Sequence, residues 1–293
     1  MDQAERLRQM VSGAQPTPRP SSGPRVLVVT SGKGGVGKTT IAANLALVFA
    51  SEGIRTGLVD ADLGLSGVDV MLGLTPKYHL GHVLEGSRTL DEVAVEASDG
   101  LLVYPGGQGW RSLADASDTD LLRLTGGLQS LASKPRLLVV DTSPGITRNV
   151  SAFARLGDLA LVVTTADPTS QADAYASIKT LHQDRPDRPL RLLVNQVSGP
   201  AESIRVEDGL ASVTQRFLGI KVPALGFVPD DSAVSRSLQL QKALSLVFPQ
   251  SPSAVALRSL ARRLARELLD SSVRSPNAEA AASASQAAPT EYL

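Results

Sequence analysis

The sequence predicts an α/β fold in which a mostly parallel sheet of about seven or eight strands carries helices on both faces. Its apolar runs are continuous rather than alternating, which is typical of strands covered on both sides. Helix-length stretches separate most of these runs, as the crossover connections of a parallel sheet require. Glycine and polar residues gather just after the runs, where open α/β sheets bind their ligands.

The strand candidates are rich in Val and Leu, and most of them end at Gly, Pro, Asp or Ser. The first candidate leads through a Gly-rich segment into a helix candidate at 38–53, and a second clear helix candidate covers 170–183. The strand candidates occupy residues 25–31, 55–62, 100–107, 135–143, 159–167, 190–197 and 222–231.

Four zones divide the chain. Residues 1–11 form a charged segment that we expect to dock a partner, and the Pro, Gly and Ser residues of 12–25 predict a flexible linker. The predicted nucleotide-binding domain spans 26–270. The Ala/Ser-rich residues 271–293 predict a disordered tail.

The composition excludes several classes of protein. The 29 basic and 29 acidic side chains balance, which argues against a general nucleic-acid-binding surface. The chain has no cysteine, so it has neither disulfides nor thiolate metal sites. Its charged N-terminus is unlike a signal peptide, and no run approaches the roughly 20 apolar residues that cross a bilayer. We therefore expect a cytoplasmic protein.

The segment "GKGGVGKT" between the first strand candidate and its helix fits a Walker A phosphate loop. Its backbone N–H groups and the helix N-terminus favour phosphate oxygens, so we expect ATP or ADP here. Lys38 is predicted to reach the β- and γ-phosphates, Thr39 to ligate Mg²⁺, and Thr40 to lie near the α-phosphate. The predicted nucleotide-binding residues of this loop are Gly32, Lys33, Gly34, Gly35, Val36, Gly37, Lys38, Thr39 and Thr40.

Three carboxylates end strand candidates near this loop. Asp60 and Asp62 are alternate residues and can point to the same phosphate end. Asp60 suits a contact to metal-bound water, and Asp62 can orient the water that attacks the γ-phosphate. Asp141 ends "LLVVD" in the Walker B layout and would hold Mg²⁺ through water. The predicted metal site is therefore Thr39, Asp60 and Asp141.

A second lysine, Lys33, lies in the same loop, five positions before Lys38. Its side chain is either simply solvated or directed at a phosphate of another subunit. The segment "KGGVGKTT" resembles the deviant Walker A motif of the MinD/ParA ATPases. The resemblance implies a homodimer with ATP in which Lys33 crosses to the partner's phosphates. It also implies ATP hydrolysis to ADP and phosphate, with Lys33, Lys38 and Asp62 as the catalytic residues.

The resemblance also places four residues around the adenine: Asn195, Pro229, Asp230 and Asp231. An amide such as Asn195 can pair with the N6/N7 edge of the base, whereas a carboxylate can accept only from its amino group. These positions are equally typical of ordinary turn residues at strand ends.

Within this family, several stretches are similar to the branch that controls flagellar number (FlhG, also called FleN). They are "DQAERLR" at Asp2–Arg8, "DADLGLSGVDVMLGL", "YPGGQG" and "TTADPTSQADAYASIK". The resemblance implies a flagellar GTPase (FlhF-like) as the partner of Asp2–Arg8, with a flagellar transcription activator or a C-ring protein as further candidates. ParA-type DNA or cargo partitioning and MinD-type division-site positioning stay open as alternatives.

The stretch 252–270 predicts an amphipathic helix. Its arginines Arg258, Arg262 and Arg266 form a stripe at i, i+4 spacing beside an apolar face. This face suits either packing on the sheet or reversible binding to a membrane surface, and leucines at this spacing more often belong to a core. The apolar face consists of Leu257, Leu260, Ala261, Leu264 and Leu268.

Overall fold

The structure is a computed structural model that describes residues 23–62, 67–107, 116–131 and 135–270. The predicted docking segment 1–11, most of the predicted linker and the predicted tail 271–293 lie outside the described residues.

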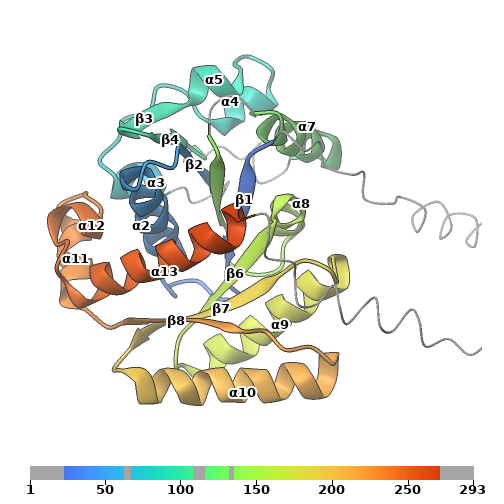
Figure 1. The fold of residues 1–293 in the computed structure, drawn as a ribbon. Coiled ribbons are helices and arrows are strands. Elements are labelled where there is room, and N and C mark those ends of the chain that lie inside the picture. Colours follow the sequence, from blue (N-terminus) through green and yellow to red (C-terminus); the bar gives the residue numbers. More distant parts are fainter. Residues whose placement is uncertain (1–22, 63–66, 108–115, 132–134, 271–293) are drawn as a thin grey trace, which may run out of the picture.

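The described residues form an eight-stranded sheet with the order β3-β4-β2-β5-β1-β6-β7-β8 (Figure 1). Every neighbouring pair is parallel except β3 and β4. The predicted fold class is therefore confirmed, and each predicted run contains one strand. The eight strands are β1 (Arg25–Thr30), β2 (Thr56–Ala61), β3 (Val95–Ser98), β4 (Leu101–Tyr104), β5 (Leu137–Thr142), β6 (Leu159–Thr164), β7 (Leu190–Val197) and β8 (Ala224–Pro229).

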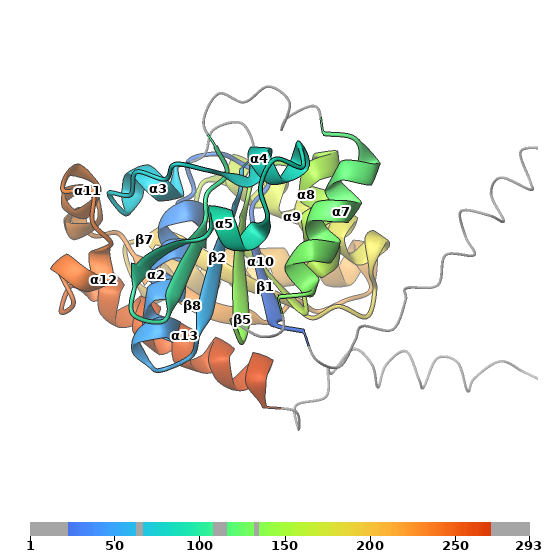
Figure 2. The same ribbon diagram turned by 90° about the horizontal axis from the view of Figure 1, so that it is seen from above.

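Helices cover both faces of the sheet because the strands alternate their apolar side chains between two layers (Figures 1 and 2). Leu27 and Val29 of β1 face one layer, and Val26 and Val28 face the other. The first layer contains α2 (Lys38–Ser51), α3 (Val68–Met71), α11 (Ser232–Gln239), α12 (Leu244–Val247) and α13 (Pro252–Leu269). The second contains α4 (Leu80–Leu84), α5 (Leu90–Val93), α7 (Asp118–Gln129), α8 (Arg148–Leu156), α9 (Pro168–Asp184) and α10 (Pro200–Leu218).

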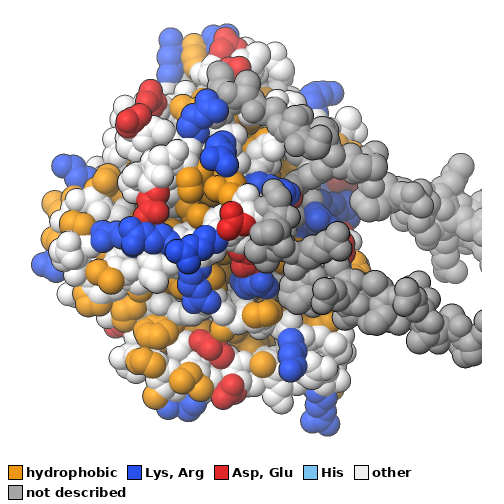
Figure 3. Space-filling model, viewed as in Figure 1, with side chains coloured by type: hydrophobic (Ala, Val, Ile, Leu, Met, Phe, Trp, Pro, Cys, Tyr) orange, Lys and Arg blue, Asp and Glu red, His pale blue; other side chains and the backbone are white. Residues whose placement is uncertain are grey.

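Helix α13 is a core helix. Its predicted apolar face is buried in the same cluster as α2, and the helix packs against both α2 and β8. In the described fold this face is packed in the core and is not open to a membrane surface, because its leucines are already covered. The arginines stay at the surface, where Arg262 pairs with Glu52 at the end of α2. Figure 3 shows Lys and Arg side chains gathered over the middle of the face that α13 crosses. Within the described ranges, no helix is both long and apolar enough to cross a bilayer.

Candidate nucleotide-binding site

The loop between β1 and α2 has the backbone of a phosphate loop. Gly37 precedes α2 with φ 88°, a left-handed conformation that favours glycine, and no side chain caps the helix start. A Cβ at Gly37 would lie 2.5 Å from Nδ2 of Asn195, and a Cβ at Gly32 would collide with the backbone of Asp173. The first N–H groups of α2 are therefore left open toward the space in front of the loop.

Lys38, the first residue of α2, is buried with only 7% of its surface exposed. Burial lowers the pKa of Lys38, and the negative charges of Asp141 and Asp62 oppose that effect. The fold thus brings together one lysine and two carboxylates that the sequence places far apart.

Asp141, at the end of β5, is buried with 1% exposed, and neither of its oxygens accepts a hydrogen bond of ordinary geometry from a described residue. Burial and the neighbouring Asp60 raise the pKa of Asp141 to about 7, against the lowering effects of the Thr39 hydroxyl and the Lys38 charge. A buried carboxylate with two open oxygens is costly unless a cation offsets its charge. Asp141 and Thr39 therefore fit an oxygen-bound cation such as Mg²⁺.

Asp60 is paired with Asp141 in the register of β2 and β5, and its carboxylate binds backbone amides. Its oxygens accept hydrogen bonds from the backbone N–H groups of Asp62 (3.2 Å), Gly67 (3.1 Å) and Val68 (3.2 Å). These bonds leave room for a further contact, so the predicted contact of Asp60 to metal-bound water stays a prediction. Through these hydrogen bonds Asp60 fixes the backbone that follows β2. Half-buried Asp62 lies close enough to Lys38 for their charges to interact.

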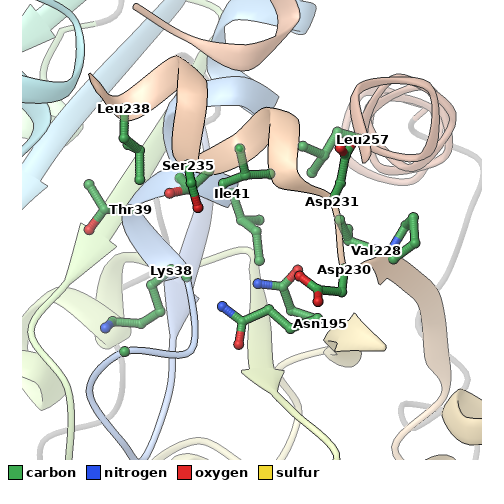
Figure 4. Close-up of a pocket in the computed structure, with 16 residues that line it drawn as sticks. Lys38, Thr39, Ile41, Asn195, Val228, Asp230, Asp231, Ser235, Leu238 and Leu257 are labelled. Carbon is green, nitrogen blue, oxygen red and sulfur yellow. The ribbon is translucent and has the colours of Figure 1, made fainter. Parts of the chain in front are cut away.

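A cavity of about 340 Å³ opens in front of the loop (Figure 4). Side chains from α2, from β7 and from the residue after β8 surround the same hollow, as Lys38, Asn195 and Asp230 show in the figure. Its walls farther from Lys38 are partly apolar, with contributions from α11 and α13. The residues on these walls are Val228, Val234, Leu238 and Leu257. Pockets with an apolar wall and a few polar groups are typical of sites that bind small molecules and cofactors.

Asn195 lines this cavity, and its side-chain amide already makes one hydrogen bond within the protein. Its Nδ2 donates to the backbone oxygen of Val36 in the phosphate loop at 2.8 Å, and the residue is 7% exposed. An amide nitrogen has two N–H groups, so this bond leaves one N–H and Oδ1, and the predicted pairing of Asn195 with the N6/N7 edge of adenine stays a prediction.

The residues after β8 divide into two roles. Asp230 is exposed at the cavity, whereas the Oδ1 of Asp231 caps α11 through Ala233 N–H (2.8 Å) and its Oδ2 accepts from Ser253 N–H at the start of α13 (3.1 Å). Burial would raise the pKa of Asp231, but these hydrogen bonds outweigh it and the pKa is lowered. Asp231 therefore links the starts of two helices, and because it also lines the cavity, its predicted adenine contact stays a prediction. Pro229 also lines the cavity, and its carbonyl oxygen accepts from the Ser253 hydroxyl at 2.8 Å.

The Lys33 side chain does not point to the cavity. Its Nζ lies 3.2 Å from Asp167 Oδ2 and 2.6 Å from Thr169 Oγ1, at the start of α9. Hydrogen bonds from Thr169 and from Lys33 hold the pKa of Asp167 down at about 2. Lys33 is therefore neither a ligand of its own loop nor freely solvated in this structure.

Comparison with known proteins agrees with this geometry. A family described as the CobQ/CobB/MinD/ParA nucleotide binding domain matches residues 27–244. The chain belongs to this family. It is 38% identical over 240 residues to the antiactivator FleN of Pseudomonas aeruginosa, covering 82% of this chain and 86% of that protein. It is 31% identical over 245 residues to the flagellum site-determining protein YlxH of Helicobacter pylori, covering 83% of each.

Solved MinD structures share the fold. The cell division ATPase MinD of Pyrococcus furiosus superposes with a TM-score of 0.72 at 24% identity, covering 83% of this chain and 98% of that one. The predicted resemblance to MinD/ParA proteins is thereby confirmed, and the family assigns nucleotide binding to this domain.

Sequence reasoning missed two residues of this MinD/ParA-type site. Asp167 gave no signal because its contact to Lys33 joins segments 134 positions apart. Gln196 lines the cavity with φ 58°, and a positive φ at a non-glycine residue leaves no mark in the sequence.

Asp141→Asn is expected to stabilise the nucleotide-free protein at pH 8 by about 4 kcal/mol. The pKa of Asp141 is about 7 in the fold against an ordinary 3.8, so the folded state keeps a proton that the unfolded chain releases. Wild-type stability therefore falls as the pH rises from about 4 to 7, and the advantage of the uncharged Asn is largest above pH 7. Thermal denaturation of both proteins between pH 4 and pH 8 measures this. A variant less stable than wild type at pH 8 would show that burial does not penalise the Asp141 carboxylate.

Proposed function

We propose that this protein is an ATP-dependent dimerising switch that regulates flagellar number and placement through assembly partners. The observation that carries the proposal is the pairing of a phosphate loop, complete with buried Lys38 and open Asp141, with a second lysine that points away from that loop. A single-subunit phosphate site needs only the first lysine. The flagellar branch is supported by the likeness to FleN and YlxH.

In the proposed reaction, ATP is hydrolysed to ADP and phosphate. The open N–H groups at the start of α2 and the Lys38 ammonium bind the β- and γ-phosphates. Thr39 and Asp141 would hold Mg²⁺, which neutralises phosphate charge when bound. Asp62, next to Lys38, orients the attacking water, and its charge holds the water's protons toward itself. Because Asp60 fixes the N–H of Asp62, the position of the catalytic carboxylate depends on β2.

In the proposed dimer, Lys33 leaves Asp167 and Thr169 and reaches the phosphates of the partner subunit. The ion pair between Lys33 and Asp167 is exposed, because 40% of the Lys33 side chain and 48% of the Asp167 side chain are accessible to solvent. Exposed ion pairs contribute little to stability, so the cost of breaking this one is small. ATP then favours the dimer, and hydrolysis returns the protein to the monomer.

Residues 1–11 are proposed as the docking arm for an FlhF-like GTPase. Deleting Met1–Val11 should leave nucleotide binding and ATP-dependent dimerisation near wild type, because β1 begins only at Arg25. It should remove stimulation of the GTPase, and pull-downs with and without ATP should lose that partner. A fall in dimerisation on deletion would show instead that the segment belongs to the folded domain.

Salt-sensitive, ATP-dependent binding to DNA by the full chain would favour the partitioning alternative.

A further inference from the structure

Gln196 occupies a β-bulge at the mouth of the nucleotide cavity. Across to β8, Asn195 pairs with Val228 and Val197 pairs with Pro229, so Gln196 has no partner in the register. Its φ is 58°, a conformation that a non-glycine residue keeps only where its surroundings impose it. Bulges beside functional sites serve to re-aim a side chain. This one gives an exposed Gln196 that lines the cavity.

The polar groups beside Gln196 differ in what they can offer a base. Asn195 uses one N–H of Nδ2 to bind Val36, and the Asp230 carboxylate can only accept. Gln196 still has both halves of its carboxamide, and its Nε2 lies 4.0 Å from the position that a Cβ of Gly37 would occupy. The end of this side chain therefore lies beside the phosphate loop.

We propose that the Gln196 carboxamide selects adenine over guanine in this cavity, an inference that rests on the proposed binding of adenine nucleotides. Its Oε1 accepts from the N6 amino group and its Nε2 donates to N7, the two-point pairing that amides make with adenine. Guanine presents acceptors at both N7 and O6, so the same amide can make only one of the two hydrogen bonds, and guanine is disfavoured.

The test is calorimetric titration with ADP and GDP, which need no dimer. Gln196→Met keeps the length of the side chain and removes its hydrogen bonding. It should weaken ADP binding about tenfold, equivalent to about 1.4 kcal/mol, and GDP binding by less. The matched control is Gln241→Met, because Gln241 is also an exposed glutamine with positive φ (51°) but does not line the cavity. It should bind both nucleotides like wild type.

Gln196→Gly separates base recognition from a purely structural bulge. Glycine accepts the positive φ, so this variant should melt at or above the wild-type temperature and still lose the preference for ADP. A wild-type ratio of ADP to GDP affinity in both Gln196 variants would overturn the inference. Equal binding of ADP and GDP by the wild type would overturn it as well, without touching the proposed phosphate site. Failure of that site would instead appear as no binding of either nucleotide.

Discussion

Lys38→Ala is expected to weaken nucleotide binding at least about 100-fold, a loss of about 2.7 kcal/mol. The ammonium of Lys38 is the buried cation at the start of α2, and charge-assisted hydrogen bonds to phosphate are among the strongest polar contacts in proteins. Its loss also removes the positive charge that interacts with Asp141 and Asp62. The carboxylates would then repel the incoming phosphates. Calorimetric titration with ADP and with ATP measures the change.

Two further variants make this result specific. Lys242→Ala removes an exposed lysine outside the cavity and should bind nucleotides like wild type. Lys38→Met keeps the apolar stem of the buried side chain, so its fold should be intact while binding is still lost. Unchanged affinity in Lys38→Met would show that this loop does not hold phosphates through Lys38.

The sequence predicts the phosphate loop well because its residue types are fixed by local geometry. Gly37 must adopt φ 88°, and neither it nor Gly32 has room for a Cβ. Such requirements leave glycines at set positions between a strand and a helix, and they can be read from the residues alone. The sheet was predictable for a similar reason, since strands covered on both faces are continuously apolar. The short edge strand β3 (Val95–Ser98), which is only partly buried, lacks that signal.

The roles of individual carboxylates were not predictable, because they depend on amides that arrive from elsewhere. Asp60, Asp141 and Asp231 all follow or end strands and look alike in the sequence. Asp60 meets the N–H groups of residues seven and eight positions on, Asp231 meets one 22 positions on, and Asp141 meets none of ordinary geometry among the described residues. Only the tertiary structure separates a carboxylate that caps amides from one that is open to a cation. The contact of Asn195 with Val36 was not predictable for the same reason, since the two residues are 159 positions apart.

Lys33→Ala is expected to bind nucleotide like wild type and to lose ATP-dependent dimerisation. Lys33 makes its contacts with Asp167 and Thr169, so its removal leaves Lys38 and the loop backbone in place. In a dimer, phosphates of the two subunits approach each other across an interface that excludes water. Like charges placed together there cost several kcal/mol without a cation between them. Hydrolysis should fall as well, because the charge that develops on the γ-phosphate also loses its counter-ion.

Light scattering with ATP measures dimerisation, and calorimetry with ADP measures nucleotide binding. Lys179→Ala, at an exposed position of α9, is the matched control.

Thr169→Val is a second, independent test of the role of Lys33. The Thr169 hydroxyl is the nearer of the two groups that hold Lys33, and Val keeps its shape without its oxygen. If Lys33 acts on the partner's phosphates, loosening its contact within the same subunit should strengthen the ATP dimer. If the contact to α9 is its whole role, Lys33→Ala should dimerise normally and Thr169→Val should change nothing. That pair of results would reduce Lys33 to a structural tie between the phosphate loop and α9.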